Sequence, residues 1–222
     1  MDTMRLFRAF ADKEEVKPDV ERLYKRILAN NDSGELSSAF SECLAECDRV
    51  IVPKACYMLL PLKSNGSELD FGAFVLSSEG LSKNLGDSQF CAVMGATVGI
   101  GIDRVIAKYS ALSPLKAWIC QLIGSAYIEN WCDRLCEQIK KETGMFLKPR
   151  YSPGYGDLQL TDQTQLFKIL DLPKNCGITL TNSFIMRPSK SVTAFAGLSD
   201  RPYCPVNKCS LCNKIDCEFR ND

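Results

Sequence analysis

The chain has 222 residues, of which 45% are hydrophobic and 24% are charged, values typical of a globular protein with a sizeable core. Lysine plus arginine equals aspartate plus glutamate at 27 each, so the formal net charge is zero and no broad basic surface for nucleic acid is expected. Histidine is absent, which removes the usual general base and every histidine-activated nucleophile. No independent hydrolase or oxidoreductase site is seen.

Two further features concern the cellular compartment. No apolar run reaches the roughly 18 residues that a membrane helix needs, and the chain carries no polybasic tail for a membrane surface. The first 15 residues contain basic side chains but lack the apolar core of a signal peptide. The sequence therefore predicts a cytoplasmic protein with neither membrane nor nucleic acid as a partner.

The first half of the chain contains signals for both helices and strands. Hydrophobic residues recur at helical spacing in residues 19–29 and again in residues 36–47. Residues 57–62 and 69–76 have the pattern of strands, and the Asn-Gly pair ending at Gly66 is suited to a tight hairpin turn between them.

A glycine-interrupted apolar run follows, and then the clearest helix. Residues 90–102 fit a strand that passes through a close turn into a helix near residues 103–109. The pair Ser113-Pro114 provides an N-cap and a proline at the first helical position, and Gly144 ends the hydrophobic stripe that begins there. A helix of about 29 residues, roughly 43 Å long, is predicted.

The last third of the chain again contains signals for both helices and strands. Thr161 is predicted to cap a short helix, and residues 178–185 and 191–198 are predicted to be paired strands joined by MRPSKS. Because helices and strands do not alternate regularly, an α+β fold is indicated. The composition changes sharply only after Asp200, so the expected organisation is one domain over residues 1–200 and a cysteine-rich tail over residues 201–222.

The stretch RYSPGYGD, residues 150–157, carries more functional groups than a turn needs. Arg150 offers a rigid fork of donors that suits a carboxylate or phosphate. Gly154 and Gly156 allow a backbone to approach a ligand closely, and Tyr155 offers a flat face for a ring or a cation. The loop could therefore bind a small molecule with a carboxylate and an aromatic or cationic part. A tight connection with an exposed arginine is the alternative.

Glu129 is the second candidate, because it lies between Ile128 and Trp131 in an apolar part of the predicted long helix. One interpretation is a solvated helix face. The other is a carboxylate directed at the ammonium group or a ribose hydroxyl of a ligand.

The tail contains four cysteines in fourteen residues: Cys204, Cys209, Cys212 and Cys217. In a chain without histidine, an all-thiolate site is the common option for zinc, and the first three cysteines, at gaps of four and then two residues, also match the start of a plant-type ferredoxin pattern. An iron–sulfur cluster or zinc is predicted, with redox-active thiols and inert thiols as alternatives. The other eight cysteines are expected to fill the core.

Two motifs are shared with a known family. In the first, an arginine is followed after three residues by Gly-Tyr, here Arg150, Gly154 and Tyr155. The second, Thr-x-Ser-Phe-x-Met-x-Pro, spans residues 181–188, and the segment GSAYIE precedes the loop. With this order and spacing, residues 115–198 resemble the activation domain of cobalamin-dependent methionine synthase, in a stand-alone form.

The resemblance implies an α+β fold with a central, mainly antiparallel twisted sheet and long helices packed around it. It also implies that the protein binds S-adenosylmethionine and supports reductive methylation of cob(II)alamin in a partner methionine synthase or related corrinoid methyltransferase. The partner carries the cobalamin, and a low-potential donor of the flavodoxin or ferredoxin type supplies the electron. The chain would then be a component of a methyltransferase activity in methionine biosynthesis, acting by positioning and exclusion of water.

The resemblance also assigns residues. The ligand carboxylate is expected at Arg150, and adenine and ribose at backbone groups near Ser152 and Gly154. The sulfonium is expected near Tyr155. At the position of a family tyrosine near the end of the second strand, this chain has Ala196.

Two other functions stay open at this point. One is a non-catalytic module that binds or senses S-adenosylmethionine or a corrinoid and carries a structural four-cysteine metal site. The other is a metal-binding adaptor whose cysteine tail docks partners. By analogy with iron–sulfur proteins, a cluster in the tail would receive or relay the electron for reactivation.

Overall fold

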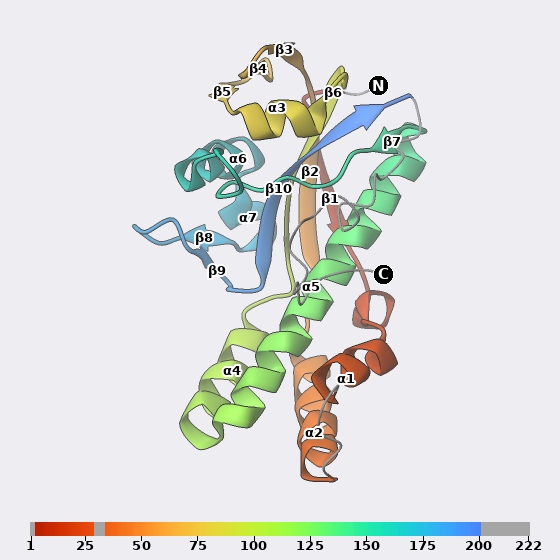
Figure 1. Ribbon diagram of the computed structural model, residues 1–222, viewed down its shortest axis with the longest axis vertical. Helices are drawn as coiled ribbons and strands as arrows, with labels where there is room; N and C mark the ends of the chain where they lie inside the picture. Colours follow the sequence, from red (N-terminus) through yellow and green to blue (C-terminus); the bar gives the residue numbers. More distant parts are fainter. Residues whose placement is uncertain (1–2, 29–33, 201–222) are drawn as a thin grey trace, which may run out of the picture.

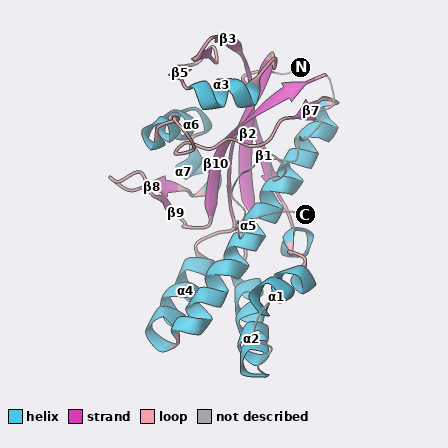
Figure 2. Ribbon diagram, viewed as in Figure 1, coloured by secondary structure: helices cyan, strands magenta, loops and turns pink. Residues whose placement is uncertain are grey.

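A computed structural model gives the structure of the protein and describes residues 3–28 and 34–200 (Figure 1). The fold is α+β, as predicted, with one central antiparallel sheet and helices on both of its faces. At one end of the sheet the helices continue beyond the strands as a separate cluster (Figure 2). Along the described residues, no helix combines the length and apolarity needed to cross a membrane.

The central sheet has five strands in the order β1-β2-β6-β10-β7, and every neighbouring pair is antiparallel. The strands are β1 (Leu6–Phe10), β2 (Lys54–Pro61), β6 (Phe90–Thr97), β7 (Phe146–Leu147) and β10 (Ser191–Ser199). Strands β2, β6 and β10 are buried along nearly their whole length, and β2 and β6 are accordingly almost continuously apolar rather than alternating.

The sheet separates two hydrophobic cores. Small residues dominate the face toward the long helices, where Ala92, Ala194 and Ala196 are fully buried. Larger residues such as Val93 and Phe195 point to the other core. Ala196 therefore lies inside the protein, where its side chain has no access to a surface ligand.

The helices of the extended cluster are α1 (Val20–Leu28), α2 (Gly34–Val50), α4 (Gly101–Leu112) and α5 (Pro114–Thr143). Helix α5 confirms the predicted helix. The Ser113 side chain accepts a hydrogen bond from the Lys116 N–H, Pro114 stands in the first turn, and Gly144 ends the helix with a left-handed φ of 67°. A short 3-10 turn, η1 (Lys13–Val16), precedes α1.

The hairpin at Gly66 is confirmed, but its strands differ from the prediction. It joins β3 (Lys63–Asn65) to β4 (Glu68–Asp70), while residues 57–62 belong mainly to β2. Residues 69–76 are divided between β4 and β5 (Val75–Ser77), because the Asp70 carboxylate accepts from the Gly72 N–H at 2.7 Å and turns the chain. These three strands form a small second sheet beside α3 (Glu79–Leu85).

The predicted short helix is present as α6 (Gln163–Leu170), and α7 (Leu172–Cys176) follows it. The predicted start of α6 at Thr161 is wrong. Thr161 lies inside a 3-10 turn, η2 (Leu160–Asp162), and does not cap the helix. The turn is closed by Asp162, whose carboxylate accepts from the Gln159 N–H at 3.2 Å.

The predicted pairing of residues 178–185 with residues 191–198 is also wrong. Strand β8 (Thr179–Leu180) pairs instead with β9 (Met186–Arg187). The Thr181 N–H donates to the Ile185 carbonyl at 2.9 Å, which closes a separate hairpin. This hairpin projects away from the central sheet (Figure 1). After Pro188 the chain enters β10, which pairs with β6 and β7.

Candidate ligand-binding site

A groove of ≈600 Å³ lies between α5 and residues 147–155, the segment that follows α5 and runs beside β10. Its volume is within the usual range for small-molecule sites. Helix α5 contributes one wall and residues 147–155 most of the other. The lining residues are Glu129, Asp133, Cys136, Glu137, Lys140, Leu147, Lys148, Pro149, Arg150, Ser152, Tyr155 and Val192.

Backbone hydrogen bonds fix the wall that carries the loop. After β7, the Lys148 N–H donates to the Gly197 carbonyl at 2.8 Å. Tyr151 and Phe195 then exchange two hydrogen bonds, at 2.8 and 2.9 Å. Arg150 lies between Lys148 and Tyr151, so the hydrogen bonds to β10 fix the position of its backbone.

Arg150 joins the two walls of the groove. Its Nη1 atom lies 2.6 Å from Asp133 Oδ1, and its Nη2 atom lies 2.8 Å from Glu129 Oε2. The arginine side chain is 21% exposed, whereas the two carboxylate side chains are 63% and 68% exposed. A largely covered arginine side chain is thus paired with two well-exposed carboxylates in the groove.

The structure brings Glu129 to Arg150, where its carboxylate is a direct ion-pair partner of the guanidinium. Asp133, which the sequence prediction missed, completes the arrangement one helical turn further on. The spacing of 129, 133 and 137 along α5 was a signal that could have shown these acidic residues to share one face.

Ser152 and Tyr155 line the groove, whereas Gly154 does not. The Ser152 carbonyl accepts from the Tyr155 N–H at 3.1 Å, and the Gly154 N–H donates to the Leu158 carbonyl at 2.9 Å. These backbone groups therefore already stabilise the turn itself. Tyr155 is 59% exposed in the lining of the groove, and its ring packs edge to face with that of Tyr151 at 6.0 Å between centroids.

Asp157, whose role the sequence did not reveal, attaches the loop to the start of α3. Its carboxylate accepts from the Ser78 hydroxyl at 2.7 Å, the Glu79 N–H at 2.6 Å and the Gly80 N–H at 3.0 Å. The Ser78 hydrogen bond, followed by that from Gly80, lowers the pKa of Asp157 below its ordinary value. The carboxylate thus anchors the loop to the start of α3.

Gly156 permits this attachment. It has a φ of 55°, and a Cβ atom at this position would lie 2.5 Å from the Tyr151 hydroxyl. That hydroxyl instead donates to the Tyr155 carbonyl at 3.2 Å. A side chain at Gly156 would be strained by its backbone conformation and would disturb Tyr151 as well.

We expect Asp157→Asn to loosen the loop, since an amide is a weaker acceptor for the three donors. Because the folded-state pKa of Asp157 is lowered, its stabilisation is present above the unfolded-state pKa and is lost as the pH falls through the folded-state value. Amide hydrogen exchange at Glu79 and Gly80 should quicken in the variant and, in the wild type, as the carboxylate is protonated. Unchanged protection in both cases would contradict this role. Asp162→Asn, at the neighbouring 3-10 turn, is the control.

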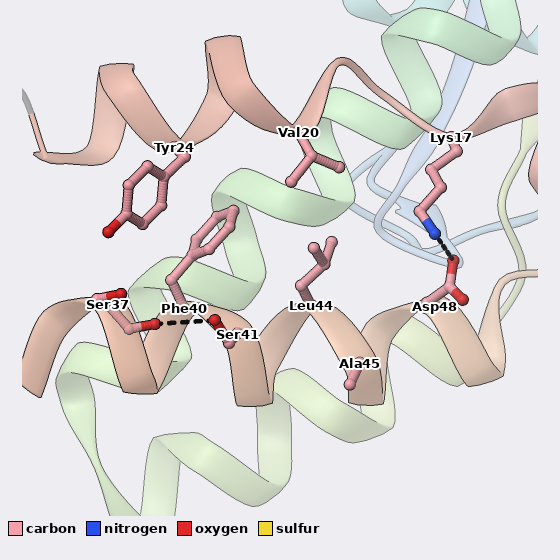
Figure 3. Close-up of a pocket in the computed structure, with 9 residues that line it drawn as sticks. All are labelled: Lys17, Val20, Tyr24, Ser37, Phe40, Ser41, Leu44, Ala45 and Asp48. Carbon is pink, nitrogen blue, oxygen red and sulfur yellow. Dashed lines mark hydrogen bonds and ion pairs between the residues drawn. The ribbon is translucent and has the colours of Figure 1, made fainter.

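A second groove, of ≈540 Å³, lies between α1 and α2 (Figure 3). Tyr24 and Phe40 pack edge to face at one end, with ring centroids 5.2 Å apart. Lys17 and Asp48 occupy the other end, and their Nζ and Oδ1 atoms are 3.9 Å apart.

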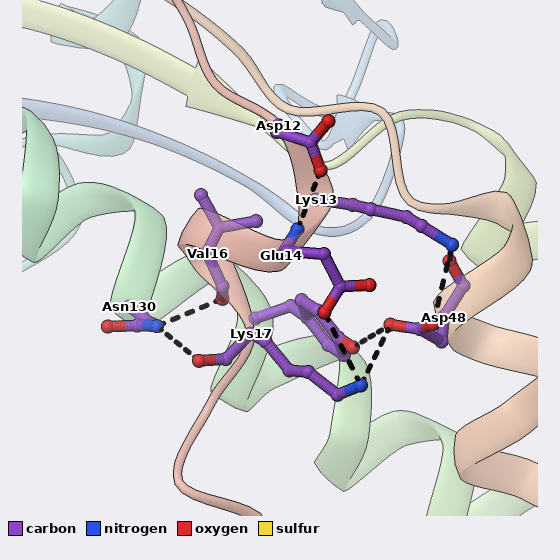
Figure 4. A network of polar contacts seen from close by, with 8 residues as sticks. Asp12, Lys13, Glu14, Val16, Lys17, Asp48 and Asn130 are labelled. Carbon is purple, nitrogen blue, oxygen red and sulfur yellow. Dashed lines mark hydrogen bonds and ion pairs between the residues drawn. The ribbon is translucent and has the colours of Figure 1, made fainter.

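The polar end of this second groove belongs to a structural network (Figure 4). Asp48 accepts from the Tyr127 hydroxyl at 2.7 Å and pairs with Lys13 at 3.4 Å. Asn130 donates to the Val16 and Lys17 carbonyls at 2.9 and 2.8 Å, which ties η1 to α5. These contacts hold the N-terminal segment in place, so the groove at Arg150 is the stronger candidate for a ligand.

No group of three or more histidine, cysteine, aspartate or glutamate side chains capable of holding a metal occurs within the described ranges. Seven of the eight cysteines outside the tail are buried and Cys136 is half-buried at the groove, in agreement with the predicted core role. Cys204, Cys209, Cys212 and Cys217 lie outside the described residues.

Comparisons with known proteins bear on both the fold and the groove. A solved structure described as the "Crystal Structure of the MetH Reactivation Domain bound to AdoHcy" has a TM-score of 0.66 and 15% sequence identity, covering 91% of this chain and 81% of that chain. The search of curated proteins found no match. The family model for the vitamin B12 dependent methionine synthase activation domain matches residues 78–210, which include α5, the loop and β10. With more than half of its length matched, this chain belongs to the activation domain family of vitamin B12-dependent methionine synthase.

Proposed function

We propose that the protein binds S-adenosylmethionine in the groove between α5 and residues 147–155 and thereby supports reductive methylation of cobalamin in a partner protein. The partner would be a B12-dependent methionine synthase or a related corrinoid methyltransferase. The observation that carries the proposal is Arg150, a largely covered guanidinium facing a groove of ligand size within the motif that matches the family. The AdoHcy bound to the structurally similar reactivation domain supports this choice of ligand.

The groove has partners for each part of the ligand. The Arg150 fork suits the carboxylate in two-point geometry, and Glu129 is placed for the ammonium group or a ribose hydroxyl. Ser152 lies on the same wall for the nucleoside, and the exposed face of Tyr155 suits a cationic sulfonium. Gly154 acts indirectly, because its φ of 92° shapes the turn that presents Tyr155.

The chemistry places limited demands on this chain. The ligand supplies an activated methyl group, and the partner's cobalt, reduced by a low-potential donor such as a flavodoxin or ferredoxin, is the nucleophile. The residues of this chain hold the ligand, fix its orientation and exclude water, which accounts for a site without histidine. A cytoplasmic location is consistent with such partners.

A reactivation assay tests this function. Inactive cob(II)alamin methionine synthase is mixed with the protein, S-adenosylmethionine and a reductant, and the absorption spectrum is followed. Recovery of the methylcobalamin spectrum only when the protein is present is expected. Ligand binding without recovery would favour a sensor module instead, and an absence of ligand binding would overturn the proposal.

For the remaining parts of the chain we propose one domain over residues 1–200 and a metal-binding tail over residues 201–222. The four cysteines of the tail, Cys204, Cys209, Cys212 and Cys217, are suited to an iron–sulfur cluster or to zinc.

Protein purified without oxygen should therefore contain iron with sulfide, or zinc, at about one site per chain. Replacing Cys209 and Cys212 by serine should remove the metal, whereas Cys136→Ser, in the groove, should not. Metal-free protein that reactivates its partner would contradict a role for the tail in electron transfer.

A further inference from the structure

Asp133 is a groove residue to which the proposed ligand contacts give no role. It lies one turn from Glu129 on α5, and both carboxylates bind Arg150, at 2.6 and 2.8 Å. Without ligand, both terminal nitrogens of the guanidinium thus already have an anionic partner. A ligand carboxylate can use the fork of Arg150 only if at least one of these contacts is exchanged.

Each of the other two cations of the groove already has a carboxylate partner. Lys140 pairs with Glu137 at 2.6 Å, and Lys148 pairs with Asp87 at 2.7 Å. Arg150 is left to neutralise Glu129 and Asp133 together, which leaves one carboxylate in excess. Two like charges one helical turn apart repel each other when the cation between them is withdrawn.

The proposed ligand and its demethylated product differ in one charge. S-adenosylmethionine carries a carboxylate, an ammonium group and a cationic sulfonium. S-adenosylhomocysteine carries the same carboxylate and ammonium group, but its sulfur is a neutral thioether. When the ligand carboxylate occupies Arg150, the two released carboxylates meet two cationic centres in the first case and one in the second.

Resting on the proposed function, we propose that Asp133 is a specificity-determining residue that favours the sulfonium ligand over its thioether product. In the free protein Asp133 pairs with Arg150. In the complex its charge is compensated by the sulfonium, while Glu129 meets the ammonium group. After methyl transfer this compensation is lost, and Asp133 competes with the product carboxylate for Arg150, which promotes product release. Its 68% exposure leaves the side chain free to change partners.

The test measures Kd for S-adenosylmethionine and S-adenosylhomocysteine in the wild type and in Asp133→Asn. The variant should bind the sulfonium ligand about fivefold more weakly, the size of one partly exposed charge interaction. It should bind the thioether equally well or more tightly, because a competitor for Arg150 is gone. The Kd for S-adenosylhomocysteine divided by the Kd for S-adenosylmethionine therefore falls toward one. Asp133→Glu, which retains the charge, should restore most of the discrimination.

One control variant and two possible outcomes complete the test. Glu35→Gln changes the net charge equally but lies in the first turn of α2, and it should leave the ratio unchanged. A wild-type protein that binds both ligands, with the same ratio in Asp133→Asn, would overturn the role of Asp133 alone. A wild-type protein that binds neither ligand would overturn the proposed function itself.

Discussion

Replacing Arg150 by alanine should raise the Kd for S-adenosylmethionine roughly 10- to 150-fold, the equivalent of about 1.5–3 kcal/mol for hydrogen bonds to a charged group. The side chain is the one cation on the loop wall that reaches both Glu129 and Asp133 among the described groove residues. Its removal takes away the carboxylate partner and leaves two anions beside the ligand carboxylate.

Stability should change much less than affinity in this variant. Glu129 and Asp133 are each more than 60% exposed, so water can replace the lost guanidinium around them. Arg150→Lys should recover only part of the affinity, because an ammonium group lacks the planar fork. Arg187→Ala, at an exposed position in β9, is the matched control. An unchanged Kd in Arg150→Ala, measured by titration calorimetry, would remove Arg150 from the site.

Phe195→Ala should lower the free energy of unfolding by about 3–5 kcal/mol, the usual cost of truncating a buried phenylalanine. Phe195 is fully buried in the core on the face of the sheet away from α5. Its ring centroid lies 5.3 Å from that of Phe71 and 6.5 Å from that of Phe74. The cavity would therefore open between the central sheet and the segment that follows β4.

Urea unfolding followed by circular dichroism measures this loss. Phe146→Ala, in the short edge strand β7, removes a ring that is 44% exposed and should cost far less. A loss below about 1 kcal/mol for Phe195→Ala would show that this core collapses around the vacancy, contrary to the packing described.

Elements with local signals were predictable from the sequence. Helix α5 was predicted to begin at Pro114 and to end before Gly144 because a cap, a proline and a left-handed glycine act within a few residues. Strand pairing was not predictable in the same way. Residues 178–185 have the composition of a strand, but their partners depend on the hairpin at Thr181 and on the pairing of β10 with β6 and β7.

In the candidate site, too, local features were predictable and long-range contacts were not. Arg150 and Glu129 were each identified from the chemistry of a short stretch, but their direct contact depends on how the loop returns along α5. Asp157 lies in a stretch that was recognisable as unusual, yet its partners lie 77 to 79 positions earlier in the chain. The side chains of the site were thus partly predictable, whereas the contacts that hold Arg150 and the loop required the fold.

In the proposed function, this chain presents S-adenosylmethionine to a partner's cobalt. The most direct measurement uses S-adenosylmethionine labelled in its methyl group, with inactive cob(II)alamin methionine synthase, a low-potential reductant and either the wild-type protein or Arg150→Ala. Label should appear on the partner's cobalamin with the wild-type protein and be strongly reduced with the variant when the ligand is below saturation. Equal labelling with the wild type, with the variant and with no added protein would contradict the account.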